Sequence, residues 1–94
     1  MTKTIAQNEY YVIAVDAGKN RMYLTLIGYW KSRADVPKYL EDLKKGTREL
    51  SKGYTILTDV TKMKAPPQDV VNLHTEAQKV VLAAGLSKTA ELVG

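Results

Sequence analysis

The chain of 94 residues has no cysteine and only one histidine, and these two shortages exclude several kinds of chemistry. Without cysteine it can form no disulfide, no thiolate zinc site and no cysteine nucleophile. A hydrolase of the serine, histidine and acid kind would depend on His74 alone. The nearest carboxylates, Asp69 and Glu76, are spaced so that neither shares a helical face with that histidine. We therefore expect no enzymatic activity, no metal site and no other cofactor.

Long apolar runs and glycine-rich loops are also lacking. No stretch approaches the ~18–20 apolar residues that a membrane-spanning helix needs. The N-terminal segment MTKTIAQNEYY has no apolar core of a signal peptide. The six glycines are scattered singly, so none forms a phosphate-binding loop. We expect a cytoplasmic protein with no membrane span, folded as a single domain over residues 1–94.

The net charge of +4 and the pI near 9.3 raise the question of nucleic acid, because clustered Lys and Arg bind phosphate. The charge is spread along the chain, however, and is mixed with acids, as in KYLEDLKKGTREL at residues 38–50. This mixture is typical of a solvated helix face. We expect no nucleic-acid partner.

Two β-prone segments, 9–16 and 21–28, flank the turn residues AGKN and predict a hairpin. In the second segment Met22, Leu24 and Leu26 alternate with a mixed set of side chains. One face of the sheet is therefore wholly apolar, and we expect the helices to lie mainly on that face.

Residues 32–53 predict one amphipathic helix, because apolar residues recur there at spacings of three, four and seven. Ser32 or Asp35 can cap its start, and Pro37 fits only the first turn. Gly46 inside the helix lowers its stability and marks a close approach to the sheet.

The second half of the chain predicts three further elements. A short strand covers 54–59, Pro66-Pro67 sets up a helix over 68–84 that Gly85 closes, and 88–94 is a fourth strand. The order is β-β-α-β-α-β in a small mixed α/β sheet whose last three strands are parallel. Because the chain ends within the last strand, we expect either a homodimer formed through that edge or a further C-terminal portion.

Candidate functional residues follow the second and third predicted strands. Asp59 ends the third strand, and Tyr29 and Trp30 follow the second. If these strands are neighbours, the three residues emerge on one rim of the sheet, where α/β proteins place their sites. Each has a structural alternative: the carboxylate can accept hydrogen bonds from loop amides, and the aromatic pair can pack under the helix. His74 likewise either packs at the margin of the core or acts as a base or ligand.

Two segments resemble a known family. LTLIGYWKSRADVPKYLEDL, residues 24–43, resembles the strand, glycine turn and first helix of STAS domains. YTILTDVTKMKAPPQDVVNL, residues 54–73, resembles their central strand, acidic turn and second helix. STAS domains include anti-sigma-factor antagonists and the tails of sulfate transporters, and the likeness is nearest to the small bacterial SpoIIAA-like proteins, which are related to Sec14-like lipid-binding domains. It covers about residues 9–93 and implies a STAS-like fold lacking the family's C-terminal helix and strand.

The resemblance also implies roles for particular residues. The stretch Asp59-Val60-Thr61 corresponds to the family's Asp-Leu-Ser turn. The phosphorylated segment of the antagonists falls on residues 67–70, where Gln68 stands in place of the serine. The phosphorylation switch should therefore be absent, and Asp69 beside it either supplies a fixed charge or stabilises the helix dipole.

We expect a non-enzymatic STAS-like module that docks a protein partner of unknown identity through this rim. The alternative is a carrier of the lipid-binding type, which predicts an apolar pocket beside Trp30 for a small apolar or anionic ligand. A hydrolase built on His74 and Asp59 would need the two side chains to converge. The residues expected to bind the partner or ligand are Tyr29, Trp30, Asp59, Thr61, Lys64, Gln68 and Asp69, within a rim that also includes residues 64–69.

Overall fold

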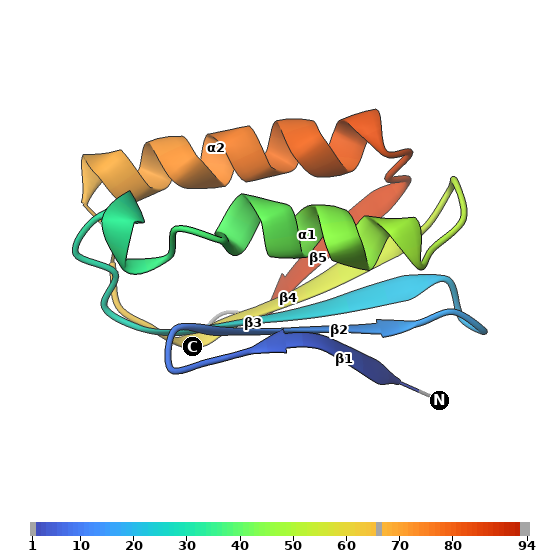
Figure 1. Ribbon diagram of the computed structural model, residues 1–94, viewed down its shortest axis with the longest axis horizontal. Helices are drawn as coiled ribbons and strands as arrows, with labels where there is room; N and C mark the ends of the chain where they lie inside the picture. Colours follow the sequence, from blue (N-terminus) through green and yellow to red (C-terminus); the bar gives the residue numbers. More distant parts are fainter. Residues whose placement is uncertain (1, 66, 93–94) are drawn as a thin grey trace.

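The computed structural model describes residues 2–65 and 67–92. Pro66, part of the predicted start of the second helix, and Gly94, in the predicted last strand, lie outside the described residues. The elements are β1 (Lys3–Gln7), β2 (Tyr11–Asp16), β3 (Arg21–Gly28), the 3-10 turn η1 (Arg33–Asp35), α1 (Tyr39–Arg48), β4 (Thr55–Met63), α2 (Gln68–Ala83) and β5 (Lys88–Leu92). The predicted mixed α/β class is confirmed, and both helices lie on one face of the sheet (Figure 1).

The five strands lie side by side in sequence order. Strands β1, β2 and β3 are antiparallel neighbours, and β3, β4 and β5 are parallel, as the helical connections predict. The sequence analysis missed β1, because it is a polar edge strand without an apolar alternation. Its first residue, Lys3, forms an ion pair with Glu49 at the end of α1, so the strand is tied to the helical layer.

The single helix expected over residues 32–53 is wrong, because the segment divides into η1 and α1. Ser32 caps η1, its hydroxyl accepting a hydrogen bond from the Ala34 amide at 3.3 Å. Val36 then leaves the helical region, with φ −129° and ψ 58°. Because Pro37 follows it, Val36 is pushed out of helical geometry, and the chain re-enters a helix only at Tyr39.

Strand β4 also differs from its prediction, since it continues four residues past Asp59 to Met63. Thr25 pairs with Asp59 and Ile27 pairs with Lys62, so β4 carries one extra residue between these two pairs. This bulge lets the polar segment after Asp59 remain paired with β3 up to Gly28. The lysines and threonine of that segment had indicated a loop.

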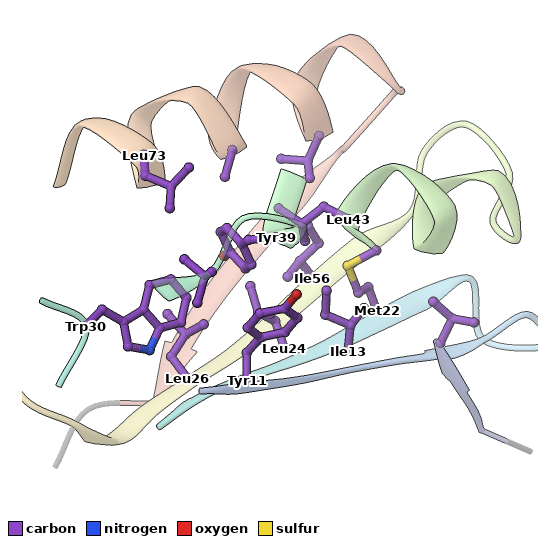
Figure 2. Close-up of a cluster of buried hydrophobic side chains, with 14 of the residues drawn as sticks. Tyr11, Ile13, Met22, Leu24, Leu26, Trp30, Tyr39, Leu43, Ile56 and Leu73 are labelled. Carbon is purple, nitrogen blue, oxygen red and sulfur yellow. The ribbon is translucent and has the colours of Figure 1, made fainter. Parts of the chain in front are cut away.

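The core lies between the sheet and the helices, and Figure 2 shows its side chains rising from β2, β3 and β4 toward α1 and α2. Gly46 lets α1 approach the sheet closely, as expected: a Cβ there would lie 2.6 Å from Met22 Cε and 3.4 Å from Ile13 Cγ2. The backbone of α2 lies closer to α1 and η1 than to the strands, and its buried side chains Val70, Leu73, Ala77 and Val81 join the core cluster that the strands also form. Tyr54 ties its C-terminal end down, donating a hydrogen bond of 2.7 Å to the Val81 carbonyl.

Candidate functional site: a cavity beneath α2

Between α2 and the helix-facing side of β3, β4 and β5 lies a cavity of about 570 Å³. Its floor comes from alternate strand residues such as Leu24, Leu26 and Ile56, and its roof from Ala77 and Val81 of α2. The cavity exists because α2 rests on α1 and η1, and its inward face offers small side chains that do not fill the remaining space. Its volume lies within the ~300–1,000 Å³ typical of small-molecule sites.

The two ends of the cavity differ in character. Met63, Lys64 and His74 line the end where β4 finishes, and Val81 and Leu86 line the opposite end, because α2 runs antiparallel to β4. Exposed residues also border the cavity, among them Lys64, Gln78 and Thr89. It therefore reaches the surface along the β5 side of the sheet.

An aromatic wall closes the side of the cavity under α1. Tyr39 and His74 line the cavity, and the Trp30 ring lies behind them, with centroid separations of 5.1 and 5.2 Å. Tyr11 packs edge-on against Tyr39 at 5.1 Å, and its hydroxyl donates a 2.5 Å hydrogen bond to Asp42. Burial, followed by the neighbouring Tyr11, raises the pKa of Tyr39, so its hydroxyl remains protonated at neutral pH.

His74 lies at the margin of the core, which is one of the two alternatives that the sequence analysis left open. It is half-buried, with its Nε2 shielded from solvent, and its ring packs against Trp30 and Tyr39. Because His74 also lies on the cavity wall, it is one of the few polar side chains that could contact a ligand in the cavity.

Trp30 cannot contact a docking partner, because its side chain is 0% exposed. Its indole N–H donates to the carbonyls of Tyr10 and Ile27, at 3.2 and 3.1 Å. Tyr29 points the other way and is 46% exposed. Of the aromatic pair, one residue therefore builds the core and the other is free to meet a partner.

Asp59 does not lie on the expected rim, because β4 continues beyond it. Its carboxylate accepts hydrogen bonds from the Thr61 amide at 2.9 Å and the Thr61 hydroxyl at 2.6 Å, which braces the bulge. These hydrogen bonds hold the pKa of Asp59 below its ordinary value. The geometry thus supports the structural alternative for Asp59, whose carboxylate accepts hydrogen bonds from the neighbouring chain.

The other residues expected to bind a partner or ligand lie near the start of α2. The Lys64 amide donates to the Gly28 carbonyl at 2.9 Å, which places that lysine beside Tyr29. Asp69 accepts a hydrogen bond from the Arg33 amide at 2.8 Å, and Gln68 bonds Asn72 one turn along α2. Tyr29, Lys64, Gln68 and Asp69 therefore remain at one end of the fold, separate from Asp59.

A catalytic pair of Asp59 and His74 is ruled out by their placement. Thr58 faces the helices and is buried, so its neighbour Asp59 projects from the opposite face of the sheet, away from α2.

Among the described residues, no three His, Asp or Glu side chains gather as a metal site would require. Within residues 2–65 and 67–92, no helix has the length and apolar character needed to cross a membrane.

The sequence analysis predicted an apolar pocket beside Trp30 only as an alternative, and of the residues expected to bind a partner or ligand only Lys64 is among the described residues that line the cavity. The available signal was a difference between the two helices: α1 buries Tyr39 and Leu43, whereas three of the four residues that α2 buries are smaller than leucine, namely Val70, Ala77 and Val81, the fourth being Leu73. Small residues on a buried helical face leave space unless the helix moves closer to the sheet. The pattern could not show that contacts with α1 and η1 prevent that approach.

Comparison of the chain with protein-family models, with curated proteins and with solved structures found no match.

Proposed function

We propose that this protein is a non-enzymatic binding protein that holds a small, largely apolar ligand in the cavity beneath α2. The observation that carries the proposal is the cavity itself, with about 570 Å³ of space and walls supplied mostly by Leu, Ile, Val and Met side chains. A well-packed domain leaves few voids larger than a water molecule, so a space of this size favours an occupant.

The composition of the wall favours an apolar ligand held by burial rather than by a dense set of hydrogen bonds. Thr58, His74, Gln78 and Thr89 are among the polar side chains that could orient it, and Lys64 contributes an ammonium group at the margin. Displacing water from such walls contributes about 25 cal/mol for each Å² of apolar surface that is buried.

The test is a cavity-filling substitution on α2. Ala77 is buried and lines the cavity, so Ala77→Phe should occupy it, whereas Ala83→Phe places the same ring on an exposed position of the same helix. The probe is N-phenyl-1-naphthylamine, a neutral dye whose fluorescence increases in apolar surroundings. We expect the parent protein and Ala83→Phe to bind the dye and Ala77→Phe to lose at least tenfold in affinity while its circular dichroism is retained. Equal binding by both variants contradicts the proposal.

Protein docking is the second candidate, and the exposed Tyr29 beside Lys64 favours it. It rests in part on the resemblance of residues 24–43 and 54–73 to STAS domains. A photo-crosslinking residue at position 29 should yield one discrete protein adduct in cells, and the same residue at the exposed position 79 of α2 should not. Equal labelling from both positions contradicts a docking site at Tyr29.

The homodimer remains a prediction of the same kind, since β5 is an edge strand paired on one side with β4. Light scattering over a range of concentrations tests it, and a constant monomer mass at high concentration contradicts it.

A further inference from the structure

We propose that the ligand of the cavity is a single-chain amphiphile with one anionic terminal group. Its head lies at the Lys64 end, and its hydrocarbon chain runs under α2 toward Leu86. This inference rests on the proposed function and adds to it the class of ligand and the direction in which it lies.

The size of the cavity restricts the ligand to a single chain. At about 30 Å³ for each water-sized group, 570 Å³ accommodates roughly 19 such groups. One acyl chain of ordinary length with a carboxylate fits within this number. A diacyl phospholipid has two such chains and a head group in addition, so part of it would have to lie outside the cavity, which disfavours it.

The shape of the cavity agrees with an extended chain. Its floor follows β4 from Ile56 to Met63, where seven steps between residues span about 23 Å of extended strand. Its roof follows α2 from His74 to Leu82, where eight steps span about 12 Å of helix. A cavity much longer than one helical turn suits a linear ligand better than a compact one.

The polarity of the walls gives the chain a direction. At the β4 end, Lys64 and His74 supply nitrogen groups. At the other end, Leu43, Val81 and Leu86 are aliphatic, and Thr89, which pairs with Ile56, adds one uncharged hydroxyl. A charged terminal group at that end would meet no cation among the described lining residues, which disfavours the reverse orientation.

The charged residues that line the cavity indicate the sign of the charge on the ligand's head group. Lys64 is the charged residue among the described lining residues, and no Asp or Glu is among them. The nearby carboxylates interact with Arg33: Glu76 forms an ion pair with its guanidinium at 2.7 Å, and Asp69 accepts a hydrogen bond from its backbone amide. A carboxylate therefore meets attraction at this end, whereas a cationic head would meet only the lysine.

The experiment compares three ligands of equal chain length that differ in the head group. Binding of tetradecanoate, 1-tetradecanol and tetradecyltrimethylammonium is measured by displacement of N-phenyl-1-naphthylamine and by the fluorescence of Trp30, which packs against the cavity wall. The variant is Lys64→Gln, and the matched control is Lys62→Gln, an exposed lysine of β4 that does not line the cavity.

We expect tetradecanoate to bind about tenfold more tightly than the alcohol, as one charge-assisted hydrogen bond would give, and the cation to bind most weakly. Lys64→Gln should reduce the affinity for tetradecanoate to that for the alcohol, and Lys62→Gln should change it less than twofold. Equal affinity for the three ligands overturns the anionic head and leaves the proposed function standing. If neither the dye nor any of the three ligands binds, both the inference and the proposed function are refuted.

Discussion

The hydrogen bond from Tyr11 to Asp42 offers a sharp test of how the helical layer is held on the sheet. Tyr11 is 2% exposed, and its hydroxyl lies 2.5 Å from Asp42 Oδ2. The Asp42 side chain is only 13% exposed, and its nearest cation, Lys45, lies 3.9 Å away. Tyr11→Phe keeps the ring packing but removes the donor, so it leaves a largely buried carboxylate with a poorer set of partners.

The expected loss follows from the charge on the acceptor. A hydrogen bond to a charged group contributes about 1.5–3 kcal/mol, so Tyr11→Phe should lower the free energy of unfolding by about 2 kcal/mol. In a chain of 94 residues this corresponds to a fall of roughly 8–16 °C in Tm. Asp42→Asn should cost less than Tyr11→Phe, because the neutral amide can still accept from the tyrosine without requiring charge solvation.

The assay is urea unfolding followed by the fluorescence of Trp30, whose ring centroid lies 6.0 Å from that of Tyr11. The double variant completes a cycle, and we expect a coupling energy of at least ~1 kcal/mol. Tyr23→Phe, on the uncovered face of the sheet, is the matched control and should change stability by less than ~0.5 kcal/mol. A Tyr11→Phe loss no larger than the control, with no coupling to Asp42, would refute the reasoning.

Three further predictions concern the same core. Burial, then the hydrogen bond and charge of the neighbouring acid, raise the pKa of Tyr11 to about 12 from 10.0. The folded state therefore favours the neutral phenol. This preference contributes up to about 3 kcal/mol to the free energy of unfolding, is fully present below pH 10 and should be lost as the pH rises from 10 to 12. Tyr11→Phe should lose less stability over the same range. Gly46→Val should lower the free energy of unfolding by ~1–3 kcal/mol in urea unfolding, because the added side chain must displace the Met22 methyl and then meets the branched side chains of Ile13 and Val15; an effect no greater than that of the exposed Lys44→Val contradicts this close contact. Trp30→Phe should lower the free energy of unfolding by about 2 kcal/mol, because the indole N–H loses two hydrogen bonds and the smaller ring leaves space unfilled. Unfolding followed by circular dichroism measures this, and an unchanged unfolding midpoint would show that the indole is not needed for stability.

Local sequence signals predicted those elements whose stability depends on neighbouring residues. The hairpin of β2 and β3 follows from two β-prone segments joined by AGKN, where Asn20 takes a positive φ of 53°. Helix α2 follows from its apolar stripe and from Gly85, whose φ is 102°. Each signal acts over a few residues, so it operates before the chain has folded.

Other elements depended on partners distant in the sequence. β1 has little apolar patterning and is held by pairing with β2 and by the ion pair of Lys3 with Glu49. The extension of β4 required β3 beside it and a bulge braced by Asp59. Pairing of this kind cannot be read from the composition of one segment, because a polar strand and a polar loop look alike.

The features of the candidate site likewise separate into those that the sequence predicts and those that depend on tertiary structure. The sequence by itself determined that cysteine chemistry is excluded, that the sheet is mixed with parallel last strands, and which apolar faces bury the core, because these follow from composition and periodicity. Only the tertiary structure decided that Trp30 is buried while Tyr29 is exposed, and that Asp59 and His74 lie on opposite sides of the sheet. It also decided that α2, resting on α1 and η1, leaves a cavity above β4, because an empty space depends on the distances between elements that no single segment encodes.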